Sequence, residues 1–314
     1  MEKGEATGDE LRWSIEQRLE FIESRLIWEG RINRADIAKR FRIAVQQASA
    51  DLGLYERYAP ENIVYDRIEK TFVPAKTFKP RFVRELADRP LLQLAAIGAG
   101  VVDRADTWFE ELPPIGVVPM PQRHVRTIIV RWILEAIRKR SAIDILYQSI
   151  KRAEPSKRII VPHALGNDGE RWHVRAWCPK NTEFRDFVLS RIDDVGPLTP
   201  AGINPKADRE WQDRVEFVLA PNPRLSEGSR RSLAKEYSME RGRLRLEVRV
   251  ALAFYMLRRL NLDLSGLDPE RQQLVLTNAD AVAAAQKTSR EAMLAAIETG
   301  EHLAKPKQDA PGGA

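Results

Sequence analysis

Arginine and aromatic side chains alternate through residues 171–192, a mixture that could bind a phosphorylated ligand with planar rings. The segment reads RWHVRAWCPKNTEFRDFVLSRI and holds four arginines, two tryptophans and two phenylalanines. Guanidinium groups bind phosphate oxygens through paired hydrogen bonds, and aromatic rings stack on bases. A nucleotide or a short single-stranded nucleic acid is therefore the favoured ligand class. The residues alone leave an alternative equally open: an amphipathic sheet whose arginines pair with Glu170, Glu183 and Asp186 on a wet surface.

Period-two alternation predicts that this segment forms two short antiparallel strands. In the strand expected at 171–177, one face carries Arg171, His173, Arg175 and Trp177. In the strand expected at 184–191, one face carries Arg185, Phe187, Leu189 and Arg191. If the two faces coincide, arginines and rings form one basic surface. Residues 142–150 alternate in the same way, so we expect a small antiparallel sheet or barrel.

A second cluster of residues that could bind a ligand lies at residues 31–50. Five basic residues there are balanced by one acidic residue, Asp36, which gives a local charge of five minus one, or +4. Glutamine can donate to and accept from adenine in the major groove, and basic side chains bind the flanking phosphates. We therefore predict that this region contacts double-stranded DNA. The predicted contact residues, with two from the segment that follows, are Arg31, Arg34, Arg42, Gln46, Gln47, Ser49, Arg67 and Lys70.

The elements that must position this cluster follow from helical periodicity and turn signals. An apolar face predicts a helix over 15–28, and Asn33 is a suitable N-cap for a short helix over 34–41. A tight connection leads to a further helix over about 44–55, which completes a helix-turn-helix pattern. Residues 62–78 then predict a strand, a basic tip at 66–70 and a second strand, which is a wing. The alternative is a helical hairpin with a solvated basic face.

The composition supports a soluble, cytoplasmic, multidomain protein. The 314 residues carry a net charge of +6, which weakly favours an anionic partner. Cys178 is the one cysteine, so the chain has no internal disulfide and suits a reducing compartment. The polar N-terminus does not resemble a signal peptide, and the longest apolar stretch, 91–102, is too short to span a membrane.

Composition shifts divide the chain into five parts, and we expect an α+β multidomain fold. A proline-rich break at 110–121 interrupts an otherwise helical connector. The C-terminal block at 211–300 alternates strand and helix and carries no residue pattern to which we can assign a chemical role. The predicted parts are a winged helix-turn-helix domain at 11–80, a helical connector at 81–140, a strand-rich ligand-sensing domain at 141–198, a small α+β domain at 206–300 and a disordered tail at 301–314.

Three motifs in the middle of the chain, ILYQS, SKRIIVPHALGNDGERWHVRAWC and FRDFVLSRI, together resemble a WYL domain. The chain departs from the Trp-Tyr-Leu triplet that names the family, since it has Trp172, His173 and Val174 there. This variant resembles the WYL repressors found beside phage-defence operons of the BREX and CBASS types. The segment QQASADLGLYERYAPENIVYDRIEKTFVP resembles the N-terminal module of that branch, and RGRLRLEVRVALAFYMLRRL resembles its C-terminal extension domain.

The resemblance implies an Sm-like, SH3-type β-barrel with a basic and polar ligand surface. Parity separates Arg158 from His163, so Pro162 must bend the strand if both bind ligand. We expect Trp172 in the core. The positions that match the family's ligand surface are Tyr147, Ser149, Arg158, His163, Arg175, Arg185 and Arg191.

These observations predict a ligand-responsive, sequence-specific DNA-binding regulator. We expect a homodimeric repressor of a phage-defence operon that binds a palindromic operator and releases it when the WYL domain binds a nucleotide or nucleic-acid signal. Four histidines and one cysteine offer no zinc-type spacing, and the sequence has no phosphate-loop, Gly-x-Ser-x-Gly or kinase signature and no acid–base constellation. We therefore expect no enzyme, metal or cofactor. The alternatives are an architectural DNA-binding subunit without a sensed ligand and, less favoured, a nucleic-acid-processing enzyme.

Overall fold

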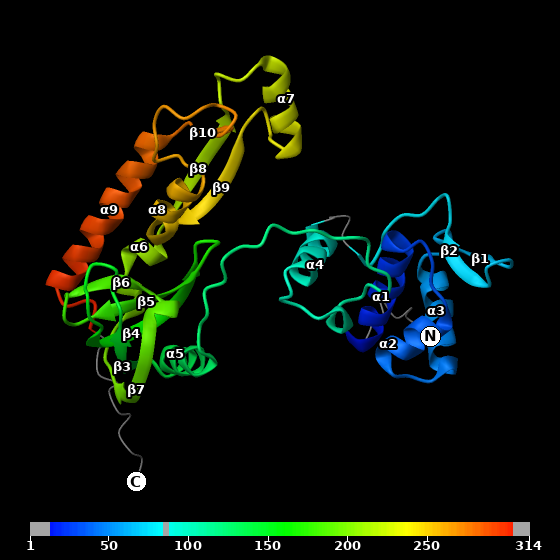
Figure 1. The fold of residues 1–314 in the computed structure, drawn as a ribbon, viewed down its shortest axis with the longest axis horizontal. Coiled ribbons are helices and arrows are strands. Elements are labelled where there is room, and N and C mark those ends of the chain that lie inside the picture. The colour runs from blue at the N-terminus through cyan, green and yellow to red at the C-terminus, as the bar shows by residue number, and fades with distance from the viewer. Residues whose placement is uncertain (1–12, 84–87, 304–314) are drawn as a thin grey trace, which may run out of the picture. The chain divides into compact units, whose positions relative to one another are not determined.

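The computed structural model describes residues 13–83 and 88–303, which divide into one unit up to Pro121 and a second from Gln122 (Figure 1). Within the described ranges, no helix is both long and apolar enough to cross a membrane. The elements of the first unit are α1 (Trp13–Trp28), α2 (Arg34–Phe41), α3 (Val45–Tyr58), β1 (Ile63–Asp66), β2 (Thr71–Pro74), α4 (Asp88–Gly98) and η1 (Arg104–Asp106).

The first unit is the predicted winged helix-turn-helix, and its local signals act as expected. Asn33 Oδ1 accepts hydrogen bonds from the backbone of Ala35 and Asp36, and Asp36 Oδ2 accepts from the backbone of Asn33 at 2.8 Å. This capping box starts α2. Arg42 ends α2 in the left-handed conformation, with φ at 53°, which makes the tight turn into α3. α3 continues to Tyr58, slightly past its predicted end.

The wing is a two-stranded hairpin that a third segment anchors to the helices. β1 and β2 pair antiparallel, from Ile63 opposite Pro74 to Asp66 opposite Thr71. Ile32 extends this sheet through two backbone hydrogen bonds with Phe72, both 2.9 Å long. The core beneath comes from the apolar faces of α1, α2 and α3 together with Ile32, and its fully buried members include Leu19, Ile22, Ile32, Ile37, Ala48 and Tyr55.

The second unit begins with α5 and a five-stranded sheet in the order β6-β5-β4-β3-β7. Ile129, Ile133 and Ala136 of α5 pack into the core of this sheet. The predicted connector, 81–140, thus holds one helix in each unit. The elements are α5 (Thr127–Lys139), β3 (Ser141–Tyr147), β4 (Ser156–Asn167), β5 (Trp172–Cys178), β6 (Glu183–Val188), η2 (Leu189–Arg191) and β7 (Ile192–Pro200).

The sheet is bent but open, so the expected Sm-like, SH3-type β-barrel does not close. Its edge strands β6 and β7 are not hydrogen-bonded to one another within the described residues. β4 makes the bend, because residues 156–160 pair with β3 and residues 161–167 pair with β5. The register shifts between Pro162 and Ala164, where proline has no N–H to donate. Pro162 therefore bends the chain where the sequence required it.

The C-terminal part of the second unit is a small α+β domain, as predicted. A three-stranded sheet in the order β10-β8-β9 packs against α8 and α9 around Phe217, Ala253 and Val282. Of the predicted tail, residues 304–314 lie outside the described residues, and Leu303 bridges to Ile203. The elements are η3 (Pro205–Ala207), α6 (Arg209–Gln212), β8 (Arg214–Pro221), α7 (Glu227–Glu236), β9 (Leu244–Arg249), α8 (Val250–Arg259), β10 (Leu274–Leu276) and α9 (Ala279–Glu298).

Candidate functional site

The exposed side of α3 carries the three side chains predicted to approach bases, and they differ in freedom. Gln47 Nε2 donates a hydrogen bond at 3.0 Å to Asp51, which is buried. Ser49 Oγ donates to the carbonyl of Val45 in the same helix at 3.0 Å. Gln46 is exposed and has no side-chain hydrogen bond within the described residues. Gln46 is therefore the side chain whose amide is free to donate to and accept from a base edge.

The predicted basic side chains around α3 fall into two groups. Arg31 Nη2 pairs with Glu111 at 2.9 Å, and Arg40 Nη1 donates to the carbonyl of Ala105 at 2.8 Å. The other group occupies the start of α2, the turn into α3 and the wing, which are positions that can flank DNA phosphates. Its members are exposed and have no ion pair among the described residues: Arg34, Arg42, Arg67 and Lys70.

The tip of the wing is a closed turn that projects its side chains outward. Asp66 Oδ1 accepts backbone hydrogen bonds from Ile68 at 2.8 Å and from Glu69 at 3.1 Å. Lys70 leaves the turn in the left-handed conformation, with φ at 52°. Ile68 is 88% exposed, an apolar side chain that sequence reasoning did not single out. The signal in the sequence that could have indicated this exposure is the position of Ile68 at the predicted tip of the hairpin.

Arg175 and Arg185 lie on opposite faces of the sheet, so the single basic surface considered from the sequence does not form. In the β5–β6 pairing, Arg175 faces Asp186, and Ala176 faces Arg185. Directly opposed residues of an antiparallel pair point to the same face, whereas neighbours along a strand point to opposite faces. Arg191 falls in η2, where strand alternation does not apply.

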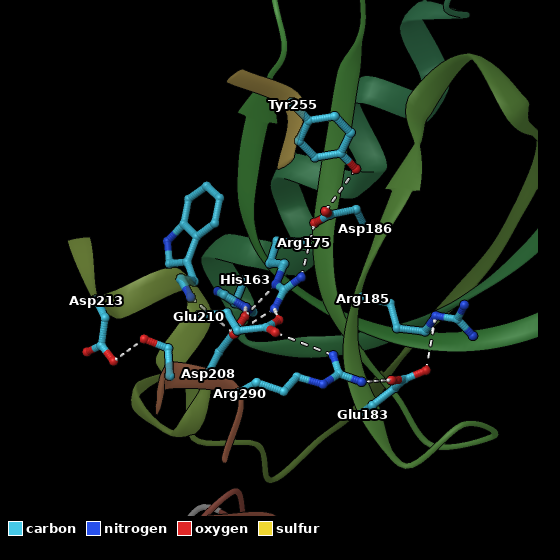
Figure 2. A network of polar contacts seen from close by, with 12 residues as sticks. His163, Arg175, Glu183, Arg185, Asp186, Asp208, Glu210, Asp213, Tyr255 and Arg290 are labelled. Carbon is cyan, nitrogen blue, oxygen red and sulfur yellow. Dashed lines mark hydrogen bonds and ion pairs between the residues drawn. The ribbon is translucent and has the colours of Figure 1, made fainter. Parts of the chain in front are cut away.

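Arg175 is 4% exposed, and three carboxylates share its guanidinium group (Figure 2). Nε and Nη2 donate to the two oxygens of Asp208 at 2.7 and 2.8 Å. Nη2 also donates to Glu210 at 2.7 Å, and Nη1 donates to Asp186 at 3.4 Å. His163 Nε2 lies 2.9 Å from the Asp208 carboxylate. Two of the predicted ligand residues, Arg175 and His163, are therefore held by this buried network.

The network continues into the C-terminal helices. Arg290 of α9 lies 3.4 Å from Glu210 and 3.2 Å from Glu183 of β6. The hydroxyl of Tyr255 in α8 donates to Asp186 at 3.1 Å. Polar contacts thus join β4, β5 and β6 to α6, α8 and α9. Figure 2 shows the labelled side chains of this network with their contacts as dashed lines.

Both central members of the network carry charge. Burial alone would raise the pKa of Asp208, but hydrogen bonds from Arg175 and His163 outweigh it and hold that pKa below its ordinary value. Burial would lower the pKa of Arg175, but the Asp208 carboxylate outweighs it and raises that pKa. The centre is a buried ion pair with two parallel hydrogen bonds, which is a strong and directional contact.

The variant triplet splits between surface and interior. Trp172, expected in the core, is 51% exposed, because it is the first residue of β5 at the margin of the sheet. His173 is buried, with Nε2 2.9 Å from Asp168 Oδ2. Its ring packs on Tyr255 of α8, with 4.6 Å between ring centroids. The side chain at position 173 therefore contacts the C-terminal domain.

The other face of the sheet holds Arg158 and Arg185 near the β5–β6 turn. Arg158 Nη1 donates to Asn181 of that turn at 3.3 Å. Arg158 Nε and Ser156 Oγ are buried without a hydrogen-bond partner in the described part of the chain. Arg185 is exposed, with Nε 3.3 Å from Glu183. Two arginines and a serine thus share one face at one end of the sheet.

The three remaining predicted ligand residues, Tyr147, Ser149 and Arg191, do not form one surface. Tyr147 is buried, and its hydroxyl accepts a hydrogen bond from the backbone of Val188 at 3.2 Å. Ser149 follows β3, and the backbone of the preceding Gln148 donates to the carbonyl of Arg191 at 3.0 Å. Ser149 and Arg191 therefore flank the same backbone contact, whereas Tyr147 supports the core.

Comparison with protein-family models gives three matches along the chain. Residues 14–96 match the winged helix-turn-helix domain of the BrxR transcriptional regulator, and residues 129–197 match the WYL domain. Residues 214–282 match the BrxR C-terminal dimerization domain. The architecture predicted from the motifs, with a winged helix-turn-helix, a WYL domain and a C-terminal extension, is confirmed.

Full-length relatives agree with these matches. The DNA-binding transcriptional repressor CapW of Stenotrophomonas maltophilia is 39% identical over 275 residues, which is 87% of this chain and 92% of that protein. The chain belongs to the CapW family of WYL-domain proteins. CapW of Escherichia coli (strain KTE188) is 37% identical, over 88% of this chain and 93% of its own. CapW of Pseudomonas aeruginosa is 37% identical, over 86% of this chain and 91% of its own.

The limits of the matches show how the CapW architecture is distributed along this chain. The winged-helix match extends through most of α4, and the WYL match includes most of α5. The dimerization match runs from β8 to the start of α9 and includes β9. Residues 205–212, which supply Asp208 and Glu210 to the network, lie between the WYL and dimerization matches.

Proposed function

We propose that this protein is a homodimeric transcriptional repressor that binds a palindromic operator through α3 and the wing. The observation that carries this proposal is the amide of Gln46 on the exposed side of α3, flanked by four exposed basic side chains; among the described residues the amide has no hydrogen-bond partner and the four side chains have no ion pair. The CapW relatives are DNA-binding transcriptional repressors by name, which supports the same activity here. One recognition helix reads few base pairs, so two half-sites related by a two-fold axis supply the specificity that a genome requires.

The second part of the proposal is that the WYL sheet binds the signal that releases the operator. Arg158 and Arg185 occupy one face of the sheet, which also carries Ser156, whose Oγ is buried without a hydrogen-bond partner among the described residues. A buried polar group without a partner destabilises a protein, and an anionic ligand would complete these hydrogen bonds. Ser149, in the loop after β3, and Arg191, in η2, are the further contacts that we propose. A nucleotide or a short single-stranded nucleic acid fits this chemistry.

In this proposal Arg175 and His163 transmit the signal rather than bind it. Their contacts with Asp208 and Glu210 tie the sheet to the C-terminal helices. A ligand changes operator affinity only if it prefers one of two arrangements of the protein. A network that joins β4 and β5 to α6 and α9 is an element that two such arrangements would position differently. Because the sequence resembles WYL repressors found beside phage-defence operons, we propose that the regulated genes are those of such an operon.

Gln46→Ala is expected to relax base discrimination at particular operator positions by about 1–3 kcal/mol, because a bidentate contact to a base edge is lost. The measurement is the Kd for the operator and for a set of single-base variants of it. Gln47→Ala is the matched control with a smaller expected effect, since the Gln47 side chain is bound to Asp51. An unchanged base preference in Gln46→Ala would contradict the assignment of α3 as the reading helix.

Arg67→Ala is expected to weaken binding to every DNA sequence alike, because a phosphate contact carries no base information. The slope of log K against log salt concentration should fall by about 1. Titrations of operator and random duplex at several salt concentrations measure both effects. Arg31→Ala is the control, because Arg31 is already paired with Glu111 and should change the slope less. A slope equal to that of the parent protein in Arg67→Ala would remove the wing from the DNA contact.

A further inference from the structure

β9 is an edge strand whose outer side has no hydrogen-bonded neighbour within the described residues. The sheet order is β10-β8-β9, so β9 is paired on one side only, with β8. An unpaired strand edge presents a row of N–H and C=O groups to any matching strand. We propose that β9 pairs antiparallel with β9 of a second copy, in a register centred on Leu246. This inference rests on the homodimer of the proposed function and adds the surface that forms it.

Symmetry restricts the registers that such a pair can adopt. Two identical antiparallel strands in one continuous sheet are related by a two-fold axis perpendicular to the sheet, which keeps each side chain on its own face. Opposed residues must share a face, so the axis must pass through a position where a residue faces its own copy. Within β9, the central candidates are therefore Arg245, Leu246 and Glu247.

Charge selects the register centred on Leu246. Arg245 and Glu247 lie on the outer face, and their side chains are 63% and 65% exposed. An axis at Arg245 places two arginines opposite one another and pairs only residues 244–246 of β9, because Arg243, which would face Glu247, lies outside the strand. An axis at Glu247 places two glutamates opposite one another and also Arg245 opposite Arg249. An axis at Leu246 places Arg245 opposite Glu247 of the second copy, and this pair occurs twice. Opposite charges directly across a strand pair stabilise it, and like charges destabilise it.

The inner face and the strand ends fit the same register. Leu246 would face its own copy, and Leu244 would face Val248, which extends the partly buried row beside Phe217 and Val215. Registers centred closer to the C-terminal end would pair fewer residues, because α8 begins at Val250.

The register centred on Leu246 would place Arg249 opposite Arg243 of the second copy, but contacts within its own chain hold the Arg249 side chain away from that position. Its Nη1 donates to the carbonyl of Trp211 at 2.5 Å, and its guanidinium lies 4.8 Å from the centre of the indole ring. It is thereby held within its own chain rather than extended toward Arg243 of the second copy. The match of residues 214–282 to a dimerization domain places β9 inside the region that the family model associates with assembly.

Two complementary charge reversals test the proposal. Arg245→Glu leaves glutamates at both positions 245 and 247, and Glu247→Arg leaves arginines at both, so each variant alone places like charges opposite one another twice. Each should dimerise about tenfold more weakly than the parent protein. An equimolar mixture should form heterodimers with near-parental affinity, because every glutamate then faces an arginine. Analytical ultracentrifugation of the full chain, with one variant fluorescently labelled, measures both effects.

The mixing experiment separates an interface from a loss of local stability. Each reversal also removes a pair within the chain, Arg245 with Glu216 or Glu247 with Arg214, but both pairs are exposed and contribute little. Arg231→Glu on α7, which removes the similarly exposed pair with Glu227, is the control and should dimerise like the parent.

The outcomes distinguish this inference from the homodimer itself. A monomeric parent protein would contradict the homodimer and the interface together. A dimeric parent whose dissociation constant neither reversal changes would overturn the β9 interface alone. Weakened variants that fail to recover on mixing would also overturn it, because the reversals would then act within each chain. Recovery restricted to the mixture supports the register centred on Leu246.

Discussion

Arg175→Met should lower the free energy of unfolding of the second unit by about 3–5 kcal/mol, the usual loss when one partner of a buried ion pair is removed. Methionine retains much of the volume, so the loss reports charge rather than a cavity. Asp208, which is fully buried, would lose its two hydrogen bonds from the guanidinium group. Glu210 and Asp186 would lose theirs as well. Urea denaturation followed by tryptophan fluorescence is a suitable measurement, because Trp177 and Trp211 lie near the network.

The control for this prediction is Arg290→Met in the same network. Arg290 is 47% exposed and pairs with Glu183 and Glu210 at its margin, so its removal should cost no more than about 1 kcal/mol. Arg175→Met and Asp208→Asn should both destabilise strongly, and their double variant should lose less than the sum, since the two groups form one interaction. A loss for Arg175→Met as small as that for Arg290→Met would show that the buried ion pair does not hold the sheet to the C-terminal domain.

The winged helix-turn-helix could be predicted from the sequence because its determinants are local. The Asn33 capping signal, the apolar faces of α1 to α3 and the turn between the wing strands each depend on residues a few positions apart. The freedom of the DNA-facing side chains could not be predicted in the same way. Arg31 is paired with Glu111, which is 80 residues away in the sequence, and nothing local to Arg31 indicates this.

The partners of Arg175 were beyond the sequence for a related physical reason. Alternation shows which residues of one strand share a face, but the register between strands decides which faces coincide. Here the register places Arg175 opposite Asp186 and moves Arg185 to the other face. Asp208 and Glu210 come from α6 and the turn before it, 33 and 35 residues further along the chain. The arginine–aromatic alternation of the segment 171–192 thus serves two surfaces: one binds the C-terminal helices, and the other is the proposed signal site.

Whether the expected β-barrel closes could not be predicted from the sequence, because the pairing of the edge strands is also a long-range property. Five alternating strands are compatible with either a closed or an open sheet, and the choice depends on whether β6 reaches β7. The sequence does contain the bend, since Pro162 cannot donate a hydrogen bond in the middle of β4. It does not state how far the bend carries the two halves toward one another.

The double variant Arg158→Ala, Arg185→Ala should bind the operator like the parent protein and fail to release it when the signal is present. To shift a repressor from nearly all bound to nearly all free, a ligand must prefer the released form by about 5.5 kcal/mol. Each lost hydrogen bond to a charged group removes about 1.5–3 kcal/mol of that preference. Losing two should therefore abolish most of the response. These positions are better tests than Arg175, because neither makes an ion pair as buried as that of Arg175 with Asp208.

The measurement for this prediction combines reporter expression, with and without phage infection, and operator affinity in vitro with added nucleotides or short single-stranded DNA. Arg138→Ala is the matched control, since Arg138 is an exposed arginine of the same unit that pairs with Glu135 on α5. It should repress and release normally. If the double variant releases the operator as the parent does, then Arg158 and Arg185 are a solvated face and the signal is read elsewhere. If it fails to bind the operator at all, the assumption that this face acts only in release is wrong, because operator binding would then depend on the same arginines.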